Sequence, residues 1–279
     1  MSDAWSPALV TTGWVADHLG DLGAKLVEVD VDPTLYAEGH IEGAVGWNWT
    51  TDLQDRVRRD VLSREDFASL MGRSGITRED TVILYGDANN WFAAYAYWQM
   101  KLHGHDRVKL MDGGRLKWEK EGRPYTTALP QPTPQTYVAG PERTELRALQ
   151  PEVFGRIGEA RSAMVDVRSP AEFTGEVLAP PGLTETAQRG GHIPGAVNIP
   201  WSQAVGENGA FKSRDELAAL YASKGITPDK DVIAYCRIGE RSSHTWFVLK
   251  ELLGYPQVKN YDGSWTEWGS MVGVPVEKL

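Results

Sequence analysis

The sequence predicts an α/β protein of two tandem domains, each a mostly parallel sheet flanked by helices. In both halves, short runs rich in Val, Ile and Leu alternate with longer segments of helical apolar spacing. This alternation is typical of strand–helix–strand crossovers, which set parallel strands side by side and cover the sheet with helices. At 279 residues, the chain is also long enough for two compact cores.

An internal duplication is the second observation. The matching blocks keep one order and a spacing of 150 positions: 63–70 with 213–220, 82–85 with 232–235, and 108–113 with 258–263. A Gly-His-Ile-x-Gly-Ala-Val turn begins at Gly39 and again at Gly191. A period of this length is too long for a solenoid, so we expect two copies of one domain.

The elements follow from these patterns. Strands are predicted at 26–31, 81–86, 163–168 and 231–236, and helices at 63–72, 90–103, 213–223 and 242–253. We place an N-terminal domain at 1–123, a proline-rich linker at 124–145 and a C-terminal domain at 146–279. An insertion at roughly 175–190, with Pro180-Pro181-Gly182, is expected as an exposed loop.

Composition excludes several classes of function. The net charge of −9 argues against a nucleic-acid partner, and no apolar run approaches the roughly 20 residues that span a bilayer. The start of the chain lacks a basic region followed by an apolar core, so we expect no secretory signal and a cytoplasmic location. A single cysteine allows no internal disulfide, and His103 and His105 have no further ligands at metal spacing.

That single cysteine, Cys236, directly follows a predicted strand and precedes a predicted helix. Ligands of parallel sheets bind outside the carboxyl ends of the strands, and amides at a helix N-terminus favour an anion. We therefore expect the loop amides and two nearby arginines to lower the thiol pKa from about 8.5 to about 7, making Cys236 a nucleophile. The alternative is an inert buried thiol.

The loop, the paired turns and the block Asp262-Gly-Ser-Trp265 together resemble the rhodanese family, specifically its tandem-domain thiosulfate sulfurtransferases. The resemblance covers essentially the whole chain. It implies two rhodanese domains, of which the C-terminal one is catalytic, with Cys236 carrying a sulfane sulfur as a persulfide. The first half has Gly86 where the second has Cys236, so we expect that half to be non-catalytic.

Site roles follow from the loop and the resemblance. Arg241, and with it Arg237, is expected to bind the sulfonate oxygens of thiosulfate, although either could instead be a surface group paired with Glu240. Backbone amides of the loop are expected to face the sulfur; they belong to Ile238, Gly239, Glu240, Arg241 and Ser242. The Glu240 side chain is expected to point outward or to pair with an arginine. Ser242 could equally cap the following helix.

Supporting residues come from the preceding strand. Asp166 and Arg168 are expected to form a buried pair that braces the active loop. Animal members of the family place a substrate-binding arginine where this chain has Glu172. We therefore expect the anion contacts to come from Arg237 and Arg241, with a contribution of Arg189.

The sequence therefore predicts a sulfurtransferase that moves sulfur from thiosulfate to cyanide or another thiophilic acceptor by a ping-pong scheme, without metal or organic cofactor. One alternative is a persulfide carrier that serves a protein acceptor. A 3-mercaptopyruvate sulfurtransferase is less favoured because Arg237 stands where that branch usually has Gly. A phosphatase-like hydrolase or arsenate reductase is disfavoured because only four residues separate Cys236 from Arg241.

Overall fold

The computed structural model describes residues 4–20, 23–180 and 186–278. The chain forms two compact units: unit 1 comprises 1–143 with 205–211, and unit 2 comprises 144–204 with 212–279. Part of the insertion expected at 175–190, including Pro181 and Gly182, lies outside the described residues. Across the described ranges, no helix is both long and apolar enough to cross a bilayer.

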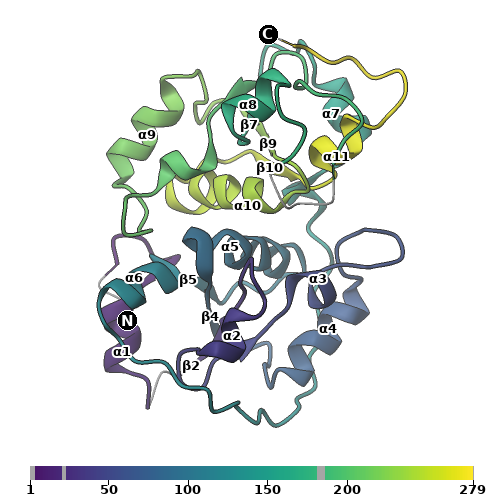
Figure 1. Ribbon diagram of the computed structural model, residues 1–279. Coiled ribbons are helices and arrows are strands. Elements are labelled where there is room, and N and C mark those ends of the chain that lie inside the picture. Colours follow the sequence, from purple (N-terminus) through teal and green to yellow (C-terminus); the bar gives the residue numbers. More distant parts are fainter. Residues whose placement is uncertain (1–3, 21–22, 181–185, 279) are drawn as a thin grey trace. The chain divides into compact units, whose positions relative to one another are not determined.

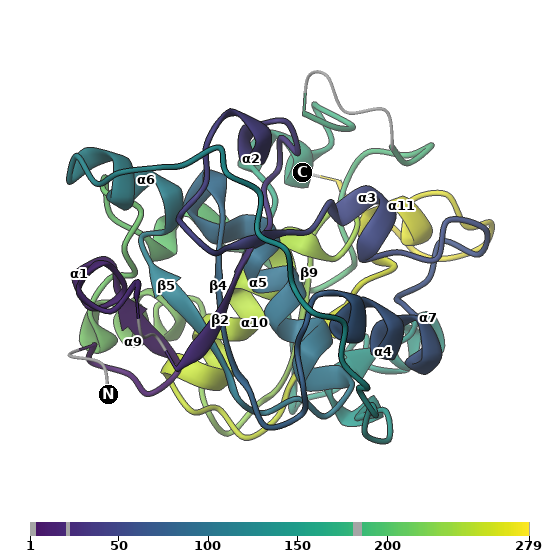
Figure 2. The same cartoon turned by 90° about the horizontal axis from the view of Figure 1, so that it is seen from below.

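Unit 1 contains a five-stranded parallel sheet in the order β1-β5-β4-β2-β3 (Figures 1 and 2). Its strands are β1 (Leu9–Thr11), β2 (Ala24–Glu28), β3 (Val45–Gly46), β4 (Thr81–Tyr85) and β5 (Val108–Asp112). Its helices are α1 (Thr12–Asp17), α2 (Leu35–Glu38), α3 (Trp49–Asp52), α4 (Arg64–Arg73), α5 (Asp87–Leu102) and α6 (Gly114–Lys120). Helix α5 packs against β4 and β5.

Unit 2 repeats the plan with a second parallel sheet, in the order β6-β10-β9-β7-β8. Its strands are β6 (Arg147–Ala148), β7 (Ser162–Asp166), β8 (Val197–Asn198), β9 (Asp231–Tyr235) and β10 (Val258–Tyr261). Its helices are α7 (Gln150–Gly155), α8 (Pro170–Thr174), α9 (Arg214–Ala222), α10 (Glu240–Phe247) and α11 (Ser264–Trp268), with shorter 3₁₀ turns η1 (Thr144–Leu146) and η2 (Trp201–Ala204). The predicted α/β class with two parallel sheets is confirmed.

The predicted strands differ from the observed ones mainly at their carboxyl ends. Strands β2 and β7 end at Glu28 and Asp166, two to three residues earlier than the apolar runs suggested. The next residues still bond to the neighbouring strand: the Val167 amide donates to the Tyr235 carbonyl at 3.0 Å. The apolar residues therefore extend beyond the end of each regular strand, because the chain is still buried where it leaves the sheet.

Two helices differ from their predicted form. The helix expected at 242–253 begins earlier, at Glu240, and changes after Phe247 into the π-helical turn η3 (Val248–Leu252). Helix α5 starts at Asp87, but the residues Ala88, Asn89 and Asn90 all have left-handed backbone angles. Such a run is unusual for residues that carry a side chain.

The proline-rich stretch predicted as a linker is extended and held against unit 1. His40 and Thr126 exchange backbone hydrogen bonds, and the Gln135 amide donates to the Gly72 carbonyl at 2.9 Å. Unit 1 also includes residues 205–211, where the Phe211 amide donates to Asp112 Oδ1 at 2.9 Å.

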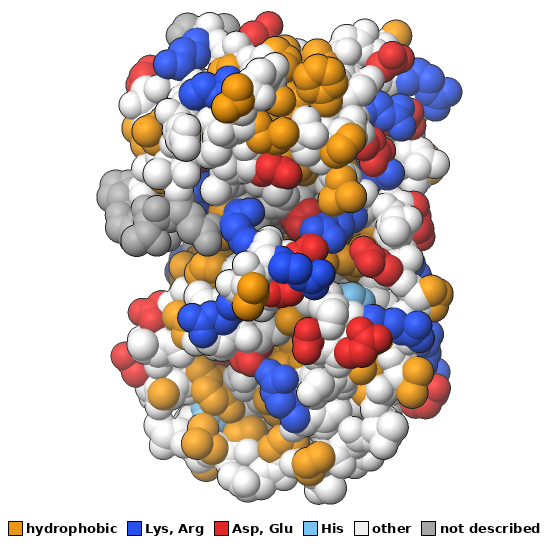
Figure 3. Space-filling model, turned by 90° about the vertical axis from the view of Figure 1, so that its right-hand side faces the viewer, with side chains coloured by type: hydrophobic (Ala, Val, Ile, Leu, Met, Phe, Trp, Pro, Cys, Tyr) orange, Lys and Arg blue, Asp and Glu red, His pale blue; other side chains and the backbone are white. Residues whose placement is uncertain are grey.

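Each unit has its own hydrophobic core. In unit 2 the core forms around Tyr235, Tyr261, Trp265 and Trp268, which lie beside the carboxyl end of β9 and in α11. In unit 1 it includes Tyr85 and Trp118. Figure 3 shows acidic and basic side chains interspersed on the face that it draws, in keeping with the mixed charge of the sequence.

Candidate active site

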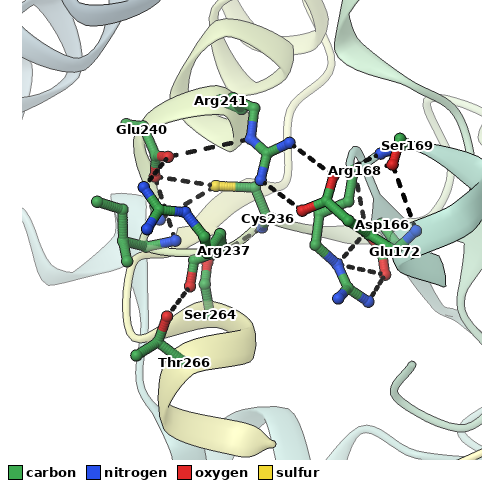
Figure 4. Close-up of polar contacts among 12 residues, drawn as sticks. Asp166, Arg168, Ser169, Glu172, Cys236, Arg237, Glu240, Arg241, Ser264 and Thr266 are labelled. Atoms are coloured by element: carbon green, nitrogen blue, oxygen red, sulfur yellow. Dashed lines mark hydrogen bonds and ion pairs between the residues drawn. The ribbon is translucent and has the colours of Figure 1, made fainter. Parts of the chain in front are cut away.

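Cys236 directly follows β9, the central strand of the unit 2 sheet, and is fully buried. Figure 4 shows the polar side chains that surround it. Its backbone is fixed on both sides by the start of α11: the Cys236 amide donates to Ser264 Oγ at 3.0 Å, and the Trp265 amide donates to the Cys236 carbonyl at 3.0 Å. The next residue is held in the same way, because the Thr266 amide and hydroxyl both donate to the Arg237 carbonyl. The thiol therefore sits on a rigid turn.

The loop closes around the sulfur through Gly239. Its amide donates to Cys236 Sγ at 3.2 Å, and its φ of +94° lies in the left-handed region that favours glycine. A Cβ at this position would lie 2.5 Å from the Cα of Asp262. Only glycine therefore allows the loop to approach the end of β10 and turn an amide toward the sulfur.

A buried polar network under the loop holds Gly239 in place. Asn260 Nδ2 donates to the Gly239 carbonyl at 3.0 Å and to Ser243 Oγ at 2.9 Å, while Ser243 Oγ donates to the same carbonyl. Ser242 Oγ donates to Asn260 Oδ1 at 2.6 Å. Of the two roles open for Ser242, helix capping is not observed: Gly239 is the N-cap of α10, and the Ser242 hydroxyl faces β10. Asn260 was not predicted as a site residue. The one sign of its role in the sequence is that a polar residue occupies a short, buried strand.

Glu240 lies against the sulfur. Its side chain is 1% exposed, and the Cys236 thiol donates to Glu240 Oε2 at 3.2 Å. The Ile238 amide donates to the same oxygen at 3.2 Å, and Oε1 lies 3.7 Å from Arg237. Of the two orientations expected for Glu240, outward or paired with an arginine, the second is observed, because the first residue of α10 directs its side chain back over the loop toward Arg237.

Arg241 forms a buried ion pair with Glu172 of α8. Its two terminal nitrogens lie 2.9 Å from the two carboxylate oxygens. Burial alone would raise the pKa of Glu172, but hydrogen bonds and charge from Arg241 outweigh it and hold that pKa below its usual value. The edge of the guanidinium that was expected to bind sulfonate thus faces a carboxylate, and anion binding by Arg241 stays a prediction.

The electrostatics of the thiol differ from the expectation. Burial raises the pKa of the Cys236 thiol, and the charge of Glu240 raises it further. Arg241 and hydrogen bonds from Ser242 act in the opposite direction but do not outweigh these effects. The predicted lowering toward 7 is therefore wrong, because the Glu240 carboxylate, a member of the loop, lies next to the sulfur.

Asp166 and Arg168 form the buried pair at the end of β7. Arg168 Nε lies 3.0 Å from Asp166 Oδ1, and a terminal nitrogen donates to the Gly191 carbonyl at 2.7 Å. The Arg168 guanidinium also stacks over the Trp265 ring at 4.6 Å. Since the Trp265 amide bonds to the Cys236 carbonyl, the pair is linked to the active loop through Trp265.

Arg189 contributes no charge to the thiol site. Its nitrogens donate to backbone carbonyls at the end of α11 and just after it, those of Trp268, Gly269, Met271 and Val274. The contribution expected of Arg189 to anion binding is therefore wrong, since the side chain braces the C-terminal segment.

The histidines of the two Gly-His-Ile turns bind backbone carbonyls. His40 Nδ1 lies 2.9 Å from the Tyr36 carbonyl, and His192 Nδ1 lies 2.9 Å from the Phe173 carbonyl. His244 is buried in α10 with its ring edge-on to Trp201. Within the described residues, no group of three or more His, Cys, Asp or Glu side chains is placed to hold a metal ion.

The matching position in unit 1 has no room for a nucleophile. A Cβ at Gly86 would lie 2.1 Å from the Val29 carbonyl oxygen. Asn90 fills the space inside the following turn, where its Oδ1 accepts from the Gly86 amide at 3.0 Å and its Nδ2 donates to the Met111 carbonyl. The left-handed run at 88–90 thus replaces the loop that holds the sulfur in unit 2.

Comparison with known proteins agrees with this architecture. The Rhodanese-like domain family matches residues 11–121 and 150–271. The chain is 54% identical over 282 residues to a Haloferax volcanii protein named "Putative thiosulfate sulfurtransferase", covering 99% of this chain and 98% of that one. It is also 54% identical over 282 residues to the "Sulfur carrier protein TtuD" of Thermus thermophilus, covering 100% and 99%.

Solved structures show the same fold. The anaerobic ergothioneine biosynthesis enzyme of Chlorobium limicola, in complex with trimethyl histidine, superimposes with a TM-score of 0.85 at 26% identity, over 97% of this chain and 70% of that one. The wild-type structure of EanB matches with a TM-score of 0.84 at 26% identity, over 97% and 69%. With two matched segments, two parallel sheets and close relatives along the full length, the chain belongs to the rhodanese family.

Proposed function

We propose that the protein is a sulfurtransferase that carries a sulfane sulfur on Cys236, with thiosulfate as donor and cyanide or another thiophilic compound as acceptor. The observation that carries the proposal is the thiol at the end of β9, with the Gly239 amide 3.2 Å from its sulfur. The names of the relatives support the same reaction class.

The reaction would proceed in two steps. Cys236 Sγ attacks the outer sulfur of thiosulfate, a new S–S bond forms, and the old S–S bond breaks as its electron pair leaves with sulfite. The acceptor then attacks the outer sulfur of the persulfide and returns the thiolate. Because the chain contains no second cysteine, no internal disulfide can release the sulfur, so an external nucleophile is required.

The surrounding groups would share the binding of the anions. Arg237 and Arg241 supply positive charge, and the amides of Ile238, Gly239, Glu240 and Ser242 form the rim of the loop. Asp166 and Arg168 support that loop from behind through Trp265. Unit 1 would be non-catalytic, because its matching loop carries Gly86.

Mass spectrometry of the intact protein tests the proposal. After treatment with thiosulfate and removal of excess reagent, the protein is expected to gain the mass of one sulfur atom and to lose it on addition of cyanide. The variant Cys236→Ser is the matched control and is expected to gain nothing while remaining folded. An unchanged mass for the wild-type protein, or an equal gain by the variant, would contradict the proposal.

A sulfur relay to a protein acceptor is the second candidate, favoured by the similarity to the sulfur carrier TtuD. Steady-state turnover of thiosulfate and cyanide separates the two. Fast turnover supports the small-molecule reaction, whereas stoichiometric loading with negligible turnover supports the relay. A cytoplasmic location, predicted from the sequence, would suit either role.

A further inference from the structure

The Glu240 carboxylate lies in hydrogen-bond contact with the reactive sulfur. It is buried with the thiol, and its Oε2 accepts hydrogen bonds from Cys236 Sγ and from the Ile238 amide, each at 3.2 Å (Figure 4). Among the described residues, the other oxygen, Oε1, has no hydrogen-bond donor within reach, and its nearest cation is Arg237 at 3.7 Å. A buried carboxylate oxygen left in this state costs free energy and calls for a functional explanation.

The charges around this carboxylate are balanced. Arg237 and Arg241 face it, the latter with Nε 3.9 Å from Oε1, and Arg241 is itself paired with Glu172. On the β10 side, Asp262 packs against Gly239, but its carboxylate is bound by Arg147. On α10 itself, one turn along from Glu240, lies His244.

Two guanidinium groups and two carboxylates therefore surround an uncharged thiol. If Cys236 lost its proton to solvent, a thiolate would stand 3.2 Å from an ionised carboxylate. Like charges at this distance cannot both be stable in a buried site. Transfer of the thiol proton to Glu240, rather than to solvent, avoids this pair of like charges.

We propose that Glu240 is a catalytic residue that accepts the thiol proton of Cys236 as the sulfur attacks its donor, and returns it once the sulfur has been passed on. The inference rests on the proposed sulfur transfer and names the proton acceptor for it. Carboxylates within hydrogen-bond reach of the group that they deprotonate are common general bases.

The two half-reactions balance. In the first, the Cys236 thiol, the Glu240 carboxylate and thiosulfate give the Cys236 persulfide anion, the Glu240 carboxylic acid and sulfite. The proton moves from Sγ to Oε2, and the electron pair of the thiosulfate S–S bond leaves with sulfite. In the second, the acceptor takes the outer sulfur, and the released thiolate recovers the proton from Glu240.

The proton transfer also removes a negative charge next to the sulfur when the anionic products form. When Glu240 is protonated, its negative charge no longer opposes Arg237 and Arg241, while Glu172 stays paired with Arg241. The site then carries one more positive charge at the moment when the negative persulfide and sulfite are both present. Protonation of Glu240 thus stabilises the products of the first step.

The test is the pH profile of single-turnover sulfur loading by the wild-type protein and Glu240→Gln, with thiosulfate, which stays fully ionised throughout. A carboxylate base makes the wild-type rate nearly independent of pH between 6 and 8. The variant depends on loss of the proton to solvent, so its rate should rise about tenfold per pH unit and lie about 100-fold below wild type at pH 6. At pH 9 it should equal or exceed wild type, because the repelling charge has gone.

The shape of the profile separates the outcomes. A variant slowed equally at every pH would show that Glu240 only holds the loop, and a variant faster at every pH would show that it only repels the thiolate; either result overturns the proposal. Glu240→Asp, which keeps a carboxylate, is expected to recover the flat profile in part.

Alkylation of Cys236 by iodoacetamide over the same pH range needs no sulfur donor. It should show a lower thiol pKa in Glu240→Gln, even if thiosulfate loads neither protein. Failure of the wild-type protein to load sulfur would contradict the proposed function, whereas parallel alkylation profiles of wild type and variant would contradict the role of Glu240.

Discussion

Arg241 and Glu172 form a buried ion pair in which two nitrogens meet two oxygens, each at 2.9 Å. The carboxylate also completes the capping box of α8, where it accepts from the Ser169 amide and hydroxyl. The Glu172 side chain thus anchors a helix start and binds an arginine whose charge acts on the thiol. Binding of a sulfur-donor anion must compete with this carboxylate.

Replacing that carboxylate should therefore improve anion binding. In Glu172→Gln, Arg241 loses a charged partner but keeps a hydrogen-bond acceptor, so we expect the KM for thiosulfate to fall by about 3- to 10-fold. Steady-state kinetics with cyanide as acceptor measures this. The matched control is Glu216→Gln, which removes the carboxylate of the exposed capping box of α9. An equal change in both variants, or a higher KM for Glu172→Gln, would show that the pair does not oppose the anion.

Removing the arginine should have two separable effects. In Arg241→Ala, we expect kcat/KM for thiosulfate to fall by about 10- to 100-fold, as for loss of a charged contact worth about 1.5–3 kcal/mol. The free energy of unfolding should also fall by about 3–5 kcal/mol, because Glu172 is left buried without its counter-ion. Enzyme kinetics and urea unfolding measure the two effects.

The double variant Arg241→Ala with Glu172→Gln tells them apart. It should recover most of the stability, since no unpaired charge remains, but none of the activity. Recovery of activity together with stability would mean that Arg241 acts only by holding the fold.

The place of the thiol was predictable from the sequence because it depends on local order. A short apolar run ending at Tyr235, followed by Cys236, a glycine-containing loop and a helical pattern, specifies a strand end and a helix start. The duplication then fixed the two-domain plan, since the first half repeats the strands and helices but not the thiol.

The neighbours of the thiol were not predictable in the same way. Glu172 and Arg241 are 69 positions apart and meet only because α8 and α10 start near the same edge of the sheet. The direction of the Glu240 side chain depends on the left-handed angle at Gly239, which spacing does not reveal. Contacts of this kind determine the charge of the site, and for that reason the predicted direction of the thiol pKa was wrong.

Unit 1 should become less stable as the pH rises toward 8. Burial, followed by hydrogen bonding and charge from Glu28, raises the pKa of Asp30 from 3.8 to about 8. A carboxyl with a raised pKa in the folded state binds its proton more tightly there, so stability falls between the unfolded and folded pKa values, by at most about 1.4 kcal/mol per pH unit. Asp30→Asn mimics the protonated form and should remove most of this slope; Asp87, whose pKa burial raises to about 6, contributes the remainder below that pH.

Hydrogen exchange of amides in β4, measured at pH 5 and pH 8, reports the effect in unit 1. Asp106→Asn is the control without a slope: hydrogen bonds from Arg143 lead the effects that hold the pKa of Asp106 below its usual value, so this carboxyl is ionised in both states between pH 5 and pH 8. Equal slopes for the wild-type protein and Asp30→Asn would show that Asp30 is ionised in the folded state across this range.

The close approach of Gly239 to Asp262 predicts that Gly239→Ala will disrupt the active loop. Its left-handed angle alone should cost about 1–2 kcal/mol in the free energy of unfolding. The added Cβ would also lie 2.5 Å from the Asp262 backbone, which cannot rotate away as a side chain would.

Gly225→Ala is the matched control in the same unit, with φ of +75° and nothing within 4 Å of the new Cβ. Urea unfolding should therefore show the larger loss for Gly239→Ala. Sulfur loading should fall only in this variant, because relief of the clash displaces the amide that donates to Cys236 Sγ. Equal losses of stability with normal loading would mean that the loop tolerates a side chain here, and that the contact between this amide and the sulfur is not needed to hold the persulfide.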